Sequence, residues 1–317
     1  MGKKLIVVDH NGKGDYYYIQ DALNAISKDN AGVMILVKEG VYYEKLIINK
    51  PNVTLVGEPG KDVTLIFDDQ KSLNDSGRTR YSTASVWITA DDFSAENLIF
   101  ANSAETKDMS TEAATICING DRAQFHHCGF IGRYGTVVTV PKPLRAVSDE
   151  GALDVSRQYF RCCYFEGDVN FLLGNSAAVF EFCKIHSLDR FGNETNYLTL
   201  PSVPTDENCR YVFKHCILTG EGPSQSTYLG KGMNHSPKVA LMDCRVGEHL
   251  HGNGWENGIF AEHGTLDMNN KPLEKFEASR VLTGDELSPY TLENIFTDAS
   301  WCIGTPEYQL KASSRAS

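Results

Sequence analysis

Long apolar runs are missing from this 317-residue sequence, and so are clusters of Lys or Arg. A membrane-spanning helix needs about 20 consecutive apolar residues, so the sequence predicts no such helix. The 30 Lys and Arg are outnumbered by 41 Asp and Glu, for a formal net charge of −11. This balance argues against attraction to nucleic acid or to an anionic membrane, so we expect neither as a partner.

Several motifs are also missing. No Pro-, Gly- or Ser-rich linker interrupts the chain, so we expect a single domain over residues 1–317. There is no Gly-x-Ser-x-Gly elbow for a serine triad and no Gly-rich phosphate-binding loop. His249, His251 and His263 lie close in sequence, but without a nearby acidic partner they indicate a metal site only weakly, and we expect no metal.

Cysteines are present but do not suit a disulfide framework. Nine is an odd number, and the chain is too long to need disulfide staples, so we expect reduced thiols. The first apolar run, residues 5–8, is too short for the apolar region of a secretory signal. We therefore expect a cytoplasmic protein, with secretion after removal of a signal segment as the alternative.

One short phrase recurs along the chain: an apolar residue, two further residues, a cysteine, one more residue and a second apolar residue. Its cysteines lie 20 to 35 residues apart, about one coil of a solenoid: Cys128, Cys163, Cys183, Cys216 and Cys244. Residues two apart in a strand share a face, so a bend must separate the first apolar residue from the cysteine. The repeated bend predicts stacked coils of short strands with an internal cysteine ladder, rather than a β-sandwich.

Helices are predicted near both ends of the chain. Apolar residues recur at helical spacing over residues 16–27, and Asp15 is placed to cap this helix over the first coil. A short closing helix is predicted over residues 290–296. Two polar stretches, residues 68–83 and 141–156, are predicted to be loops, and solenoids often carry functional loops on one face.

Several longer stretches follow one another in a distinctive order. They are residues 37–45 (VKEGVYYEK), 53–58 (VTLVGE), 96–102 (ENLIFAN), 120–123 (GDRA), 157–160 (RQYF), 167–174 (GDVNFLLG), 228–230 (YLG) and 279–283 (SRVLT). Together they resemble the pectin methylesterases (pectinesterases) over almost the whole chain. The resemblance implies an all-β fold, a right-handed single-stranded parallel β-helix of the pectin-lyase-like kind. It also implies a pectic or uronide oligosaccharide as partner, methyl ester hydrolysis as the reaction, and no cofactor.

The family uses two aspartates, one as the nucleophile and one as acid and then base. The resemblance places the nucleophile on Asn170 and the acid/base on Gly135. Asparagine cannot act as a carboxylate nucleophile and glycine cannot transfer a proton, so we expect standard catalysis to be lost. Asp168 is the candidate substitute nucleophile, because residues two apart on a strand face the same side.

The other positions that the family uses around its two aspartates also differ in this sequence. The resemblance places the family's glutamines on Glu112 and Tyr134, and its arginine and tryptophan on Lys231 and Met233. We expect these four residues to bind the substrate, with Lys231 pairing with a uronate. Glu112 is expected to pair with Lys231 and to disfavour fully ionised oligomers. Tyr134 is expected either to stack on a sugar ring or to pack into vacated space.

Three functions are open at this point. The first is a family esterase with a rebuilt site, and the second is a non-catalytic carbohydrate-binding pseudoenzyme. The third is a lyase or glycosidase on the same β-helix that uses Asp168 with Glu112 or Asp149. Retained family features favour the first, whereas the missing aspartates favour the second.

Overall fold

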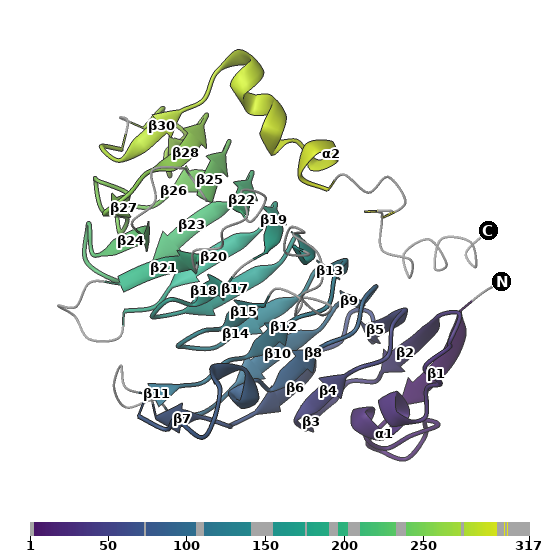
Figure 1. Ribbon diagram of the computed structural model, residues 1–317. Coiled ribbons are helices and arrows are strands. Elements are labelled where there is room, and N and C mark those ends of the chain that lie inside the picture. The colour runs from purple at the N-terminus through teal and green to yellow at the C-terminus, as the bar shows by residue number, and fades with distance from the viewer. Residues whose placement is uncertain are drawn as a thin grey trace, which may run out of the picture.

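The computed structural model consists almost entirely of three parallel sheets that share one coiled path (Figure 1). The chain passes from one sheet to the next and returns to the first sheet one coil further along. This is a right-handed parallel β-helix, as predicted. The structure describes residues 3–72, 74–105, 111–140, 155–174, 176–189, 196–201, 210–232, 239–273, 276–296, 301 and 303.

The three sheets are named A, B and C. Sheet A contains β1 (Lys4–Val8), β2 (Val33–Val37), β5 (Val53–Gly57), β9 (Ser94–Glu96), β13 (Ala123–His126), β16 (Arg157–Arg161), β19 (Ala177–Glu181), β22 (Arg210–Lys214), β25 (Val239–Met242), β28 (Phe260–His263) and β30 (Ser279–Val281). Sheet B contains β3 (Gly40–Tyr43), β6 (Val63–Phe67), β10 (Ile99–Asn102), β14 (Gly129–Ile131), β17 (Tyr164–Gly167), β20 (Lys184–Ser187), β23 (Ile217–Gly220), β26 (Arg245–Val246) and β29 (Leu266–Asp267). Sheet C contains β4 (Leu46–Ile48), β8 (Val86–Ile88), β12 (Ile116–Ile118), β15 (Val137–Thr139), β18 (Leu172–Gly174), β21 (Asn196–Pro201), β24 (Thr227–Lys231) and β27 (Trp255–Glu256).

The remaining elements are short. They are an antiparallel pair, β7 (Lys71–Ser72) and β11 (Thr111–Glu112), the helices α1 (Ile19–Asn24) and α2 (Leu292–Ile295), and the 3₁₀ helices η1 (Arg80–Thr83) and η2 (Gly284–Tyr290). None of the helices in the described part of the chain is long and apolar enough to cross a membrane.

The corner between sheets A and B repeats one backbone geometry wherever the cysteine phrase occurs. The residue before each cysteine has a φ between 52° and 54°, in the left-handed region: His127, Cys162, Phe182, His215 and Asp243. The bend turns the next residue inward, and all five predicted cysteines are buried free thiols. Tyr164 N–H donates to Cys128 O at 2.9 Å, and Lys184 N–H donates to Cys163 O at 2.9 Å. The predicted cysteine ladder is therefore confirmed.

Phenylalanine rings stack along the interior in the same way. Centroids of successive rings in the series Phe125, Phe160, Phe180 and Phe213 lie 4.7–4.9 Å apart, and each pair is within 17° of parallel. This matches the spacing of about 4.8 Å between neighbouring strands, so the stack follows from the coil repeat. Rings from sheet B meet this stack edge to face, as Phe130 meets Phe160 at 5.6 Å and 83°.

Helix α1 lies at the N-terminal end of the β-helix, as predicted, but it is shorter than expected and is capped differently (Figure 1). The Glu44 carboxylate accepts from Ile19 N–H at 2.9 Å and from Gln20 N–H at 3.0 Å. Asp15 instead accepts from Val7 N–H at 2.8 Å. The prediction that Asp15 caps the helix is wrong, because a carboxylate from the turn after β3 satisfies the free amides.

The described residues that follow β30 pack against the outer face of sheet A. The predicted helix is present as α2, preceded by η2. Phe296 and Trp301 pack with Tyr159 and Val212 in one buried apolar cluster. This helix therefore covers the side of the β-helix.

The stacked rings generate a stability prediction. Phe160→Ala should lower the free energy of unfolding by roughly 3–5 kcal/mol, because it leaves a cavity between two stacked, fully buried neighbours. Phe182→Ala is the matched control, since that ring is 49% exposed, and it should change stability by less than about 1 kcal/mol. Denaturant unfolding measures both, and equal losses would contradict this account of the core.

Buried His249 generates a pH prediction. Burial, with nearby His186 adding to it, lowers the pKa of His249 to about 4 from 6.5. As the pH falls, this histidine is therefore protonated in the unfolded chain before it is protonated in the folded chain. The free energy of unfolding should fall as the pH drops from 6.5 to about 4, and His249 should cause no further fall below pH 4. The free energy of unfolding should decrease by up to about 3 kcal/mol over this pH range. Unfolding across this pH range should show a shallower fall for His249→Gln than for wild type, and exposed His127→Gln is the control. Parallel curves for wild type and His249→Gln would rule this out.

Candidate functional site

The two positions expected to carry the family's aspartates lie side by side in neighbouring coils. Gly135 precedes β15 and Asn170 precedes β18, and these two strands pair in parallel. A further bridge pairs Tyr134 with Val169, so Gly135 and Asn170 occupy equivalent places one coil apart. Paired strands are separated by about 4.8 Å. The structure thus brings these two predicted site residues together.

Both positions have a left-handed backbone, with φ of 70° at Gly135 and 46° at Asn170. Glycine, asparagine and aspartate are the residues that adopt this conformation most readily. Space is not limiting at Gly135 either, because a Cβ there would lie 3.5 Å from Leu173 and 3.6 Å from Val138. The fold therefore accepts an aspartate at either position and does not itself exclude the carboxylates.

Asn170 presents an amide at the position where the resemblance predicts a carboxylate. Its N–H donates to Tyr197 O at 2.8 Å, and the residue is only 8% exposed. Its buried Oδ1 has no hydrogen-bond donor among the described residues. This oxygen is closed to solvent, so a ligand hydroxyl would reach it only after the side chains around it move.

Asp168 lies in the turn between β17 and β18, not on a strand. The expectation that Asp168 and Asn170 share a strand face is wrong, because the positive φ of Asn170 breaks the alternation. Asp168 is fully buried, its Oδ1 accepts from Val169 N–H at 2.8 Å, and its Oδ2 lies 3.6 Å from Arg133 Nη1. These contacts hold the turn that carries Asn170.

Glu112 contacts a lysine, but not the one expected. Strands β7 and β11 place Glu112 opposite Lys71, and Lys71 Nζ lies 3.8 Å from Glu112 Oε2. The predicted ion pair with Lys231 is wrong, because antiparallel pairing with a distant loop supplies the cation. Since Lys71 offsets the charge of this buried carboxylate, Glu112 repels an ionised ligand less than expected.

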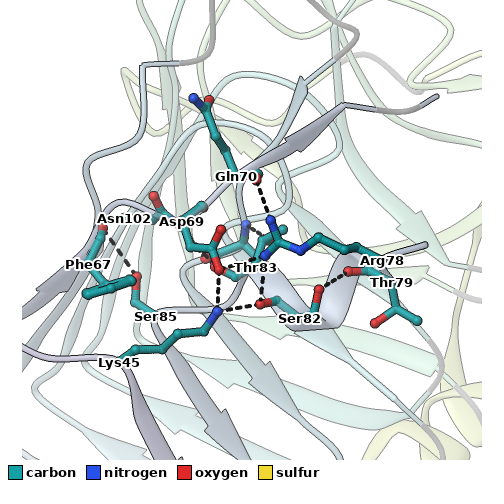
Figure 2. Close-up of polar contacts among 11 residues, drawn as sticks. Lys45, Phe67, Asp69, Gln70, Arg78, Thr79, Ser82, Thr83, Ser85 and Asn102 are labelled. Atoms are coloured by element: carbon teal, nitrogen blue, oxygen red, sulfur yellow. Dashed lines mark hydrogen bonds and ion pairs between the residues drawn. The ribbon is translucent and has the colours of Figure 1, made fainter. Parts of the chain in front are cut away.

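A polar cluster fixes the loop over residues 68–83 that carries Lys71 (Figure 2). Asp69 accepts from Arg78 Nη2 at 2.7 Å and also from Lys45, while Asn102 Nδ2 donates to Asp69 O at 3.0 Å. Burial alone would raise the pKa of Asp69, but the hydrogen bonds from Arg78 and Lys45 outweigh it and lower that pKa. The predicted loop also contains β7 and η1, and these contacts tie its described residues to Lys45 and Asn102 of the β-helix.

Lys231, at the end of β24, lies over an aromatic ring next to Asn170. Its Nζ is 4.3 Å from the centre of the Tyr197 ring, and its register partner in β27 is Glu256. Tyr197 OH donates to Glu256 Oε2 at 2.6 Å, and burial together with this bond raises the pKa of Tyr197. No ion pair of Lys231 is formed with any residue in the described ranges.

Tyr197 and Glu256 were not predicted from the sequence. The available signal was the spacing of Tyr197 and Tyr228, which is one coil long and places the two rings in register. Tyr134, which was predicted, is 8% exposed beside Gly135. The predicted residues Met233 and Asp149 lie outside the described residues.

The three clustered histidines are used separately. His249 is buried, His251 stacks on Tyr228 at 4.2 Å, and His263 Nδ1 lies 3.0 Å from Leu282 O. Within the described ranges, no group of three or more His, Cys, Asp or Glu side chains is arranged to hold a metal ion.

Comparisons with known proteins show which proteins this chain is similar to. A family model described as Pectinesterase matches residues 5–263. The chain is 28% identical to Pectinesterase 31 of Arabidopsis thaliana over 89% of each chain. It is 25% identical to Probable pectinesterase 49 of the same plant, over 96% of this chain and 82% of the relative.

Solved structures show the same fold. A pectin methylesterase in complex with a hexasaccharide superposes with a TM-score of 0.78 at 21% identity, over 96% of this chain and 100% of that one. An aspartate-to-alanine variant with a hexasaccharide gives 0.77 at 20% identity, over 96% and 100%. The pectin methylesterase from carrot gives 0.77 at 21% identity, over 99% and 97%. Because the family model spans most of the sequence, we conclude that this chain belongs to the pectinesterase family.

Proposed function

We propose that this protein binds pectic or uronide oligosaccharides over Asn170 and Gly135, and that the ordinary ester hydrolysis of the family is lost. One observation carries the proposal: the adjacent positions that would hold the two carboxylates hold an amide and a glycine. The amide of Asn170 is neutral and Gly135 has no side chain. Neither a carboxylate nucleophile nor a proton-transferring group is available there.

The same positions keep groups that suit a sugar acid. Asn170 keeps an uncharged amide, and the residue is 8% exposed. Lys231 supplies an ammonium that pairs with no described carboxylate, and a uronate carboxylate is its natural counter-ion. Tyr134 supplies a ring beside Gly135. Recognition therefore survives in this arrangement although the reacting groups do not.

One relative binds an oligosaccharide although one of its aspartates is replaced. Two of the matching solved structures are pectin methylesterases in complex with a hexasaccharide, and one of these is an aspartate-to-alanine variant. In that variant, loss of an aspartate is compatible with a bound oligosaccharide. We extend this behaviour to the present chain.

The alternative function is a lyase or glycosidase with a rebuilt site. Two of its sequence candidates are engaged elsewhere, since Asp168 lies beside Arg133 and Glu112 beside Lys71. Glu256, hydrogen-bonded to Tyr197, is the carboxylate that the structure offers in their place. Shortened or unsaturated products from a pectic oligomer would favour this alternative.

The first test is methanol release from methylated pectin. Wild type should be at least ~10⁴-fold slower than ordinary family members, because removing one member of a catalytic unit already reduces rates by about this factor. Asn170→Asp combined with Gly135→Asp should release methanol faster than wild type, whereas either single variant should not. Wild-type turnover of ~1–10³ per second, as in typical enzymes, would show that Asn170 and Gly135 are not the reacting positions.

The second test concerns Lys231. Lys231→Gln should weaken binding of a de-esterified oligogalacturonate roughly tenfold and of the fully esterified oligomer much less, because it removes the charge pair. Calorimetric titration at low and high salt measures this, and the difference should shrink at high salt. Exposed Lys28→Gln is the matched control. Equal effects on the two ligands would mean that Lys231 does not contact a uronate.

A further inference from the structure

An open pocket of about 690 Å³ lies in the last coils of the β-helix. This volume is within the range of roughly 300–1,000 Å³ that is usual for small-molecule sites. Leu250 and Phe276 form part of its wall, and His251 also lines it. Asn170, Gly135 and Lys231 do not line this pocket. The pocket is therefore separate from the proposed binding position and needs its own explanation.

A stack of rings connects the pocket to the proposed binding position at Asn170. Tyr197 stacks on Tyr228 with centroids 5.9 Å apart, and Tyr228 stacks on His251 at 4.2 Å, with the planes of each pair within 24° of parallel. Strand register places these three residues on successive coils. Asn170 bonds to Tyr197 at one end, and His251 lines the pocket at the other. A single line of equivalent positions therefore runs from Asn170 to the pocket.

The pocket presents hydrogen-bonding groups that the protein itself does not use. The side-chain amides of Gln225, Asn253 and Asn269 form no hydrogen bond with any described residue. His251 Nδ1 accepts from Asn253 N–H at 3.1 Å, so a neutral His251 carries its proton on Nε2, where it is available as a donor. Amide groups both donate and accept, which matches the hydroxyl groups of a sugar.

The charges around the pocket oppose an ionised ligand. Glu248, Asp267 and Glu277 line it together with a single cation, Lys271, in a protein whose formal charge is −11. A uronate carboxylate would be repelled there, whereas an esterified or neutral sugar would not. The pocket thus differs in preference from the position of Lys231.

We propose that this pocket is a subsite for an uncharged sugar residue of a pectic chain, such as a methyl-esterified galacturonate, whose other residues extend over Tyr228 toward Asn170. The inference rests on the proposed function and deepens it. The position at Lys231 binds a charged sugar residue, and the pocket binds an uncharged sugar residue. Together they select a partly esterified chain.

The test compares oligogalacturonates of equal length, one fully esterified and one de-esterified, by calorimetric titration. Asn253→Ala combined with Asn269→Ala removes two amides from the pocket at positions without a positive φ. This variant should bind the esterified oligomer about tenfold more weakly than wild type and the de-esterified oligomer almost unchanged. Asn11→Ala combined with Asn49→Ala, at exposed positions near the other end of the β-helix, is the matched control.

The outcomes separate this inference from the proposed function. If wild type binds and the pocket variant binds the esterified oligomer equally well, the pocket is not a subsite and the proposed function stands. If wild type binds neither these two oligomers nor a partly esterified one of the same length, the proposed function fails and the subsite fails with it. Matching thermal unfolding of the pocket variant and wild type establishes that a loss of affinity comes from the pocket itself.

Discussion

Parallel pairing between coils is the constraint on which the other features of this structure depend. At the corner, Cys162 N–H donates to Glu181 O in the next coil at 3.0 Å, and Tyr164 N–H donates back to Cys128 O at 2.9 Å. Bonds in both directions align equivalent residues at a spacing of about 4.8 Å. The cysteines, the stacked rings and the Gly135–Asn170 pair are all rows produced by this alignment.

The repeat made the fold predictable, because it appears in the sequence as a fixed order of apolar residues, bend and cysteine. The ends of the β-helix were harder to predict. Asp15 was the obvious local cap for α1, yet Glu44 caps it from a turn that lies 25 residues from Ile19. Long-range partners of this kind leave no periodic signal, so local capping rules selected the wrong carboxylate.

The sequence predicted which positions form the candidate site, but it predicted few of the contacts that their side chains make. Motif order located Gly135 and Asn170, and the register confirmed that they are neighbours. The predicted orientation of the Asp168 side chain was wrong. Side chains alternate between the two faces of a sheet only within a strand, and Asn170 has a left-handed backbone that breaks this pattern. Tyr197 and Glu256 come from other coils, so their nearness to Lys231 depends on a register that the sequence does not display.

The left-handed corners at Gly135 and Asn170 also bear on how this lineage evolves. Glycine adopts that conformation freely, asparagine and aspartate adopt it more readily than other side chains do, and a Cβ at position 135 would meet only ordinary contacts. Purifying selection for foldability therefore places little restraint on which of the three occupies either corner. The coil can therefore carry a carboxylate, an amide or no side chain at these corners without a change in the strands on either side.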